Sequence, residues 1–106
     1  MRLENKVAVV TGGAQGLGKE MAVRFASEGA RVIAVDMQDL PYEEKNVEGK
    51  ILNVTDTEAV KKFYDEVIEA YGKIDILVNN AGITADSMTR KMTDEQWDKV
   101  LNVNLK

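Results

Sequence analysis

The stretch that decides the fold is Val7-Ala-Val-Val-Thr-Gly-Gly-Ala-Gln-Gly-Leu-Gly18. Its apolar start is typical of a buried parallel strand, which reads as a short and nearly continuous apolar run. Gly12, Gly16 and Gly18 follow where this strand gives way to an amphipathic helix. A helix N-terminus presents unpaired N–H groups and the positive end of a dipole, and both favour a phosphate. The stretch therefore predicts a dinucleotide-binding turn, with an ordinary tight strand–helix turn as the alternative.

Strands and helices alternate along the rest of the chain. Strands are expected at residues 6–11, 31–35, 50–54 and 74–78, and helices at 16–28, from 55 or 56 to 71, and from 93 to 106. The second of these helices has the clearest pattern, because its apolar residues recur at helical spacing from Val60 to Tyr71. In the last helix, Trp97, Val100 and Leu101 would line the inner face. This alternation predicts an α/β fold with a doubly wound parallel sheet, strand order 3-2-1-4 and helices on both faces.

Composition excludes several classes of function. The net charge is −4 and basic residues never occur more than two in a row, which argues against nucleic acid or an anionic membrane as the main partner. The chain has no cysteine and no histidine, so disulfides, thiolate chemistry and the commonest metal ligand are excluded, and no metal site is predicted. No apolar run approaches the roughly 18 residues of a membrane span. We therefore expect a cytoplasmic protein.

Two polar groups follow other strands at the same edge of the predicted sheet. Asp36 ends the second expected strand, where a carboxylate can accept hydrogen bonds from ribose hydroxyls. A 2′-phosphate would meet like charge there, and Gln15, Met37 and Gln38 supply no cation to hold one. These residues favour NAD over NADP, with a solvated loop carboxylate as the alternative for Asp36. Asn79-Asn-Ala-Gly82 ends the fourth expected strand, where small residues let the backbone approach a ligand and where an Asx turn is the alternative.

Together, the glycine turn, Asp36 and Asn79-Asn-Ala-Gly82 resemble the short-chain dehydrogenase/reductase family over all 106 residues. The segment Gly82-Ile-Thr-Ala-Asp86, and the stretch from Trp97 through Asn102-Val-Asn-Leu105, are similar to its 3-oxoacyl-[acyl-carrier-protein] reductase and related ketoreductase branch. The resemblance implies a Rossmann-type fold, a dinucleotide cofactor, and hydride transfer between nicotinamide and a ketone or secondary alcohol. It also implies a homo-oligomer.

The resemblance assigns a role to each matching residue. Asn53 stands where the family usually has an aspartate that meets the adenine amino group, and its amide oxygen can still accept that hydrogen bond. Asn104 matches a catalytic asparagine that shapes a proton-relay water site, and it would lie on the buried face of the last helix. A polar residue near a chain end is the alternative for Asn104. The implied cofactor-binding residues are Gly12, Gln15, Gly16, Leu17, Gly18, Asp36, Asn53, Val54, Asn80, Ala81 and Gly82.

The chain also departs from the family pattern. The family's chemistry uses a serine and a Tyr-x-x-x-Lys pair, and none of Tyr42, Tyr64 and Tyr71 has a lysine four residues on. The stretch between Asp36 and Lys50 is short, so we expect it to lack a full helix. We therefore interpret residues 1–106 as the N-terminal, cofactor-binding part of a longer enzyme, inactive by itself. A non-catalytic dinucleotide-binding module and a structural fragment that associates through the open edge of the fourth strand stay open as alternatives.

Overall fold

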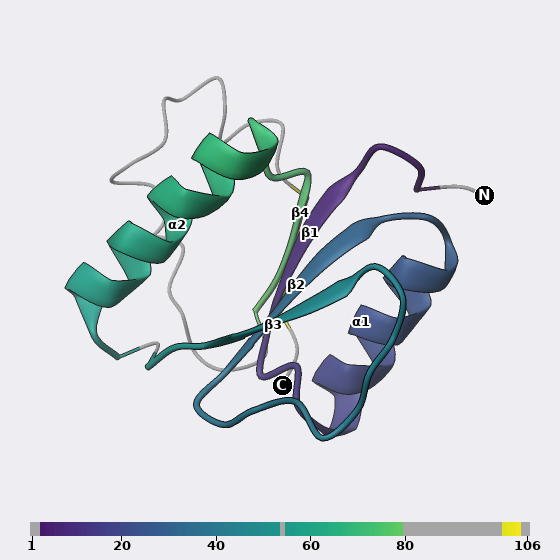
Figure 1. Ribbon diagram of the computed structural model, residues 1–106, viewed down its shortest axis with the longest axis horizontal. Coiled ribbons are helices and arrows are strands. Elements are labelled where there is room, and N and C mark those ends of the chain that lie inside the picture. Colours follow the sequence, from purple (N-terminus) through teal and green to yellow (C-terminus); the bar gives the residue numbers. More distant parts are fainter. Residues whose placement is uncertain (1–2, 54, 80–100, 105–106) are drawn as a thin grey trace.

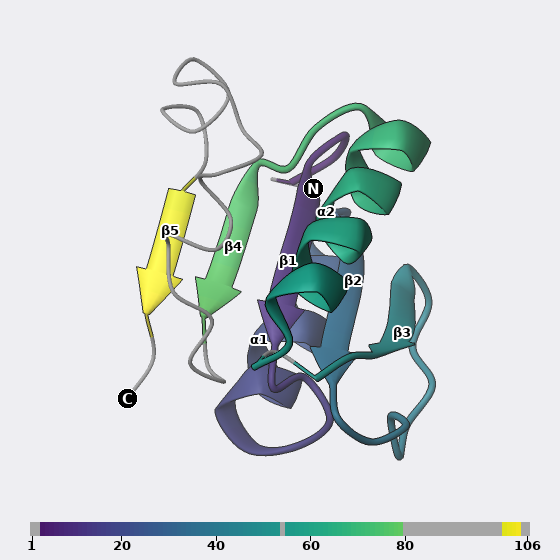
Figure 2. The same ribbon diagram turned by 90° about the vertical axis from the view of Figure 1, so that its left-hand side faces the viewer.

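The computed structural model describes residues 3–53, 55–79 and 101–104. Its strands form a single parallel sheet in the order β3-β2-β1-β4-β5 (Figures 1 and 2). The predicted α/β fold and the order of its first four strands are confirmed. The elements are β1 (Val7–Thr11), α1 (Gly16–Ser27), β2 (Arg31–Asp36), β3 (Val47–Ile51), α2 (Thr57–Tyr71), β4 (Ile76–Asn79) and β5 (Leu101–Asn104).

Among the described residues, α1 and α2 cover opposite faces of the sheet, as predicted (Figure 1). Because successive side chains of a strand point to opposite faces, β1 divides between two cores. Val7 and Val9 belong to the cluster packed under α2, whereas Ala8 and Val10 belong to the cluster packed under α1. The α1 side is rich in alanine, so that helix can lie close to the sheet. The α2 side takes larger residues, among them Val60, Phe63, Tyr64 and Val67.

Both ends of α2 carry the signals that the sequence shows. Asp56 is the N-cap, and its Oδ1 accepts a hydrogen bond from the Ala59 N–H at 3.2 Å. Gly72 ends the helix with φ +80°, a left-handed conformation that a glycine adopts without strain. Of the helices in the described ranges, none is long and apolar enough to span a bilayer.

The strand expected at 50–54 forms instead over Val47–Ile51. It pairs with β2 from Val47 opposite Val32 to Ile51 opposite Asp36. Val47 is half-buried and the other four residues of β3 are exposed, which fits its place at the edge of the sheet. A strand at the edge of a sheet need not be an apolar run. Prediction of strands from continuous apolar runs therefore misplaced this strand by three residues. The preceding 37–46 segment is a loop without a helix, as expected.

The expected helix from residue 93 to 106 is wrong where the structure describes it. Leu101–Asn104 is strand β5, parallel to β4, with Asn104 opposite Asn79 (Figure 2). Leu-Asn-Val-Asn alternates apolar and amide residues, which is the period of a strand. Pairing also satisfies N–H and C=O groups that β4 would otherwise leave open. The edge of β4 is therefore covered, and association through an open fourth strand is not available. Trp97 and Val100 lie outside the described residues.

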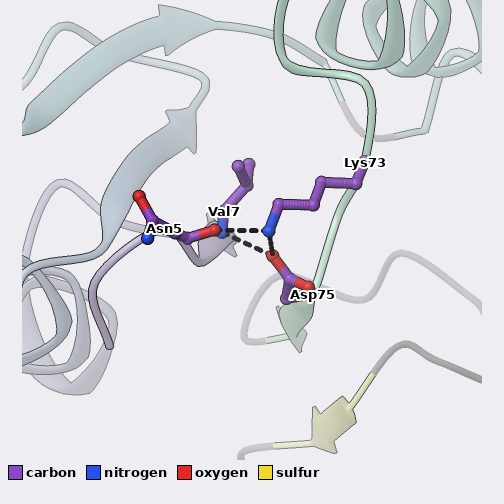
Figure 3. Close-up of polar contacts among 4 residues, drawn as sticks. All are labelled: Asn5, Val7, Lys73 and Asp75. Atoms are coloured by element: carbon purple, nitrogen blue, oxygen red, sulfur yellow. Dashed lines mark hydrogen bonds and ion pairs between the residues drawn. The ribbon is translucent and has the colours of Figure 1, made fainter. Parts of the chain in front are cut away.

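A polar cluster fastens β1 to β4 at the amino ends of the strands (Figure 3). The Asp75 carboxylate accepts a hydrogen bond from the Val7 N–H at 2.8 Å, and the Asp75 N–H donates to the Val7 carbonyl at 2.8 Å. The Lys73 ammonium lies 3.2 Å from the same carboxylate oxygen and also donates to the carbonyl of Asn5. These contacts hold the two strands in register, and so bring their carboxyl ends side by side.

Candidate functional site

The glycine turn joins β1 to α1 at the carboxyl edge of the sheet. Gly12 has φ +66° and Gly16 has φ +61°, a region that side-chain-bearing residues rarely adopt. Gln15 is the N-cap of α1 with an extended backbone, and within the described residues its side chain makes no capping hydrogen bond. Gln15, Gly16 and Leu17 are exposed. Because the first N–H groups of a helix have no acceptor inside the helix, this end of α1 is open to an anion.

Gly13 packs against β2, a role that the sequence did not suggest. Its N–H donates to the Val35 carbonyl at 3.1 Å. A Cβ built on Gly13 would lie 2.7 Å from the Ala34 Cβ, which is closer than real Cβ atoms approach. The turn therefore needs a glycine here for space and not for a positive φ. Two consecutive glycines directly after a buried strand were the available signal.

The structure brings Asp36 to the glycine turn. Its Oδ2 accepts a hydrogen bond from the Ala14 N–H at 3.0 Å, and its Oδ1 accepts from the Met37 N–H at 2.7 Å and the Gln38 N–H at 3.4 Å. The carboxylate is therefore fixed in orientation between the turn and the loop after β2. A carboxylate can accept about four hydrogen bonds, so this half-exposed group keeps capacity for a further donor.

Asn53 uses its amide oxygen within the chain. The Asn53 Oδ1 accepts from the Thr55 N–H at 3.0 Å and from the Thr55 hydroxyl at 2.6 Å. The oxygen that we expected to meet adenine is thus occupied by two donors, and it shapes the turn that leads into α2. The NH₂ group is the part of this exposed side chain left for a ligand. Val54 lies outside the described residues.

The end of β4 lies beside the end of β1. The Thr11 hydroxyl, which is buried, donates to the Val78 carbonyl at 3.3 Å. This contact places Asn79 and the start of the predicted Asn-Asn-Ala-Gly segment at the edge where the glycine turn lies. Asn80, Ala81 and Gly82 themselves lie outside the described residues. Asn104 reaches the same edge through its backbone pairing with Asn79, on a strand and not on the expected helix.

Tyr42 is a site residue that sequence reasoning missed. Its hydroxyl donates to the Gly13 carbonyl at 2.7 Å. The Lys19 ammonium lies 5.1 Å from the centroid of the Tyr42 ring, which is within cation–π range. Burial raises the pKa of Tyr42, and the nearby carboxylates of Glu44 and Asp36 raise it further. The hydroxyl therefore stays protonated, as a donor, at neutral pH. A lone tyrosine in a charged loop gave no sequence signal for this contact.

The parallel sheet with a glycine turn at its carboxyl edge defines a Rossmann-type α/β protein. Residues 6–106 match the family model described as short chain dehydrogenase. The chain belongs to this family, and the predicted membership is confirmed.

Curated relatives and solved structures agree with this assignment. The chain is 48% identical over 115 residues to the 3-oxoacyl-[acyl-carrier-protein] reductase FabG of Thermotoga maritima, covering 100% of this chain and 47% of that protein. Its identity to FabG of Escherichia coli is 37% over 111 residues, covering 99% and 46%. The chain thus spans about half the length of these curated relatives.

Among solved structures, 3-ketoacyl-(acyl-carrier-protein) reductase from Brucella melitensis complexed with NADH has a TM-score of 0.67 at 33% identity, covering 91% of this chain and 43% of that one. Aldohexose dehydrogenase from Thermoplasma acidophilum, in ligand-free form, has a TM-score of 0.70 at 35% identity, covering 91% and 37%. By their names, these relatives are dehydrogenases and reductases.

Proposed function

We propose that this chain is the cofactor-binding part of a short-chain oxidoreductase that transfers a hydride between NAD(H) and a ketone or secondary alcohol. The observation that carries the proposal is the Asp36 carboxylate, which the Ala14 N–H holds at 3.0 Å against a glycine turn at a helix N-terminus. The turn places N–H donors for a pyrophosphate next to an acceptor for ribose hydroxyls. The Thermotoga maritima relative is named 3-oxoacyl-[acyl-carrier-protein] reductase, which supports a 3-oxoacyl thioester as the class of substrate.

The proposed site divides into parts with separate tasks. The open N-terminus of α1, from Gln15 to Gly18, binds the pyrophosphate, and Asp36 binds the adenosine ribose. The bound cofactor supplies the hydride chemistry, and the protein supplies orientation. On the family resemblance, we also assign the adenine and nicotinamide-ribose sides of the cofactor to Asn53, Val54, Asn80, Ala81 and Gly82, and a proton-relay role to Asn104.

We propose NAD as the preferred cofactor because of the charge beside the turn. A 2′-phosphate on the adenosine ribose would lie close to the Asp36 carboxylate, and two like charges about 4 Å apart repel by roughly 1 kcal/mol in water and by more at a partly buried site. Lys19, at the start of α1, is a cation that could offset this repulsion. Its ammonium lies over the Tyr42 ring, so a 2′-phosphate would have to draw it away.

Titration of the chain with NADH and with NADPH, followed by the fluorescence of the reduced nicotinamide, tests the proposal. We expect the Kd for NADH to be at least about tenfold lower, since tenfold corresponds to about 1.4 kcal/mol. Asp36→Asn should reduce that ratio. Asp39→Asn is the matched control, because it removes the same charge from an exposed position in the loop that follows Asp36. Tighter binding of NADPH by the unaltered chain would contradict the choice of NAD, and binding of neither would contradict the cofactor site.

We further propose that the 106-residue chain has no turnover of its own, because it contains no Tyr-x-x-x-Lys pair to supply the proton. Incubation with NADH and a panel of ketones should leave the absorbance of the reduced nicotinamide unchanged. A steady loss of that absorbance would show that the chain is catalytically complete. A cytoplasmic location and assembly into a homo-oligomer belong to the proposal as well.

A further inference from the structure

The loop between β2 and β3 contacts the glycine turn through Tyr42. This half-buried side chain reaches across 29 positions of sequence to donate its hydroxyl hydrogen to the Gly13 carbonyl. Its ring lies beneath the Lys19 ammonium, in the first turn of α1. The two contacts stand on either side of the exposed residues 15–17. One tyrosine therefore connects the end of β1 to the start of α1.

We infer that Tyr42 is a positioning residue for the pyrophosphate-binding turn, an inference that rests on the proposed function. Gly12 and Gly16 flank the turn, and glycine has more backbone freedom than any other residue. The segment between them keeps one conformation only if its other groups are fixed. The Gly13 N–H is held by Val35 and the Ala14 N–H by Asp36. The Gly13 carbonyl is held by the Tyr42 hydroxyl.

A turn held in its binding conformation before the ligand arrives binds more tightly, because less freedom is lost on binding. Without the Tyr42 hydroxyl, the Gly13 carbonyl would bond to water and the peptide units after it could rotate. The N–H groups at the start of α1 would then spend less time directed at one point. The consequence is a loss of affinity for the diphosphate, whatever the nicotinamide end of the cofactor contacts.

Tyr71 provides a matched control. Its hydroxyl donates to Glu48 Oε2 at 3.0 Å, and the Arg31 guanidinium lies 5.8 Å from the centroid of its ring. It therefore makes the same two kinds of contact as Tyr42. Tyr71 ends α2, and Arg31 begins β2 at the amino edge of the sheet, away from the glycine turn. A merely structural effect of losing a tyrosine hydroxyl should appear at both positions.

The test compares Tyr42→Phe and Tyr71→Phe, both of which keep the ring. A hydrogen bond contributes about 0.5–1.5 kcal/mol, so we expect Tyr42→Phe to raise the Kd for NADH about two- to thirteenfold. ADP carries the diphosphate without the nicotinamide. Its Kd, measured by displacement of NADH, should rise by a similar factor. Tyr71→Phe should leave both values unchanged. Urea unfolding of each variant confirms that the binding assay is done on folded protein.

The outcomes separate this inference from the proposed function. A Kd for Tyr42→Phe equal to that of the unaltered chain, or an equal rise in Tyr71→Phe, would overturn the positioning role and leave the cofactor site intact. Loss of NADH affinity in Tyr42→Phe with ADP binding unchanged would also overturn it, because the effect would then lie away from the diphosphate. Failure of the unaltered chain to bind NADH would overturn the proposed function and this inference together.

Discussion

Replacement of Gly13 by alanine measures how closely the glycine turn packs on β2. The new Cβ would lie 2.7 Å from the Ala34 Cβ, 3.3 Å from the Ala34 Cα and 3.4 Å from the Val10 carbonyl oxygen. The Ala34 Cβ is attached directly to the backbone and cannot rotate away, so the turn or the strand has to move. Overpacking of this kind costs about 1–3 kcal/mol. We expect Gly13→Ala to lower the free energy of unfolding by about 2 kcal/mol.

The same close contact can be tested from its other side. Ala34→Gly removes the methyl group that Gly13→Ala would strike, at the cost of a glycine in a buried strand. If the contact causes the destabilisation, the double variant should be more stable than the sum of the two single effects predicts. Residues in contact typically couple by 0.5–3 kcal/mol, and we expect a coupling energy of about 1–2 kcal/mol.

Urea unfolding followed by far-ultraviolet circular dichroism gives all four free energies of the cycle. A cost below about 0.5 kcal/mol for Gly13→Ala, the usual size of a surface change, would show that the turn does not pack closely on β2. Additive effects of Gly13→Ala and Ala34→Gly would show that the cost comes from elsewhere in the turn.

Three further predictions concern other parts of the chain. Gly16→Ala should cost about 1–2 kcal/mol of stability in thermal unfolding, from its φ of +61° alone, since its Cβ would meet no described atom within 4 Å. The Tyr64 hydroxyl is buried without a hydrogen-bond partner among the described residues, so Tyr64→Phe should leave urea stability at pH 8 unchanged or raise it by about 1 kcal/mol. Burial, with the Asp65 carboxylate, raises the pKa of Tyr64 to about 12. The pKa of Tyr64 in the folded chain exceeds the unfolded value near 10. The free energy of unfolding therefore keeps its full value below pH 10 and falls as the pH rises toward 12, by at most about 2.7 kcal/mol from this group. Urea unfolding across that range should show a smaller alkaline loss in Tyr64→Phe. Asp75→Ala leaves the Val7 N–H without its carboxylate acceptor and should cost about 1–3 kcal/mol in the same assay.

Much of the fold could be predicted from the sequence because most of its elements are buried on one or both faces. Continuous apolar runs identified β1, β2 and β4, and helical spacing identified α2. The two outer strands were misplaced or missed. β3 is mostly exposed and so lacks an apolar run. The apolar spacing around β5 is compatible with two kinds of element. Leu101 is four residues from Trp97, as on one face of a helix, and two residues from Val103, as on one face of a strand.

Those parts of the candidate site that follow from the topology of the sheet were predictable from the sequence. Contacts between individual side chains and the turn were not. Parallel strands bring their carboxyl ends to one edge, which is why Asp36 was expected beside the glycine turn. The contacts of Gly13 and Tyr42 join segments well separated in sequence. The pair of glycines marks a tight turn, but no local pattern identifies the residues that Gly13 and Tyr42 contact. Asn53 shows the reverse case, because a neighbour two residues away takes the oxygen that the resemblance had assigned to adenine.

The Asp75 cluster at the start of β1 and β4 has a consequence for the order of folding. Its hydrogen bond to Val7 closes 68 positions of chain, whereas the glycine turn and Asp36 lie within one strand–helix–strand unit. Each doubling of the length of a closed loop adds only about 0.6 kcal/mol to the entropy cost of closing it. Contacts between distant residues nevertheless form late, because the chain loses this entropy before the contact stabilises it. On a growing polypeptide, the residues proposed to hold the diphosphate and ribose can therefore assemble before β4 is made. We therefore expect the contacts of Asp75 to add β4 to a strand–helix–strand unit that has formed earlier.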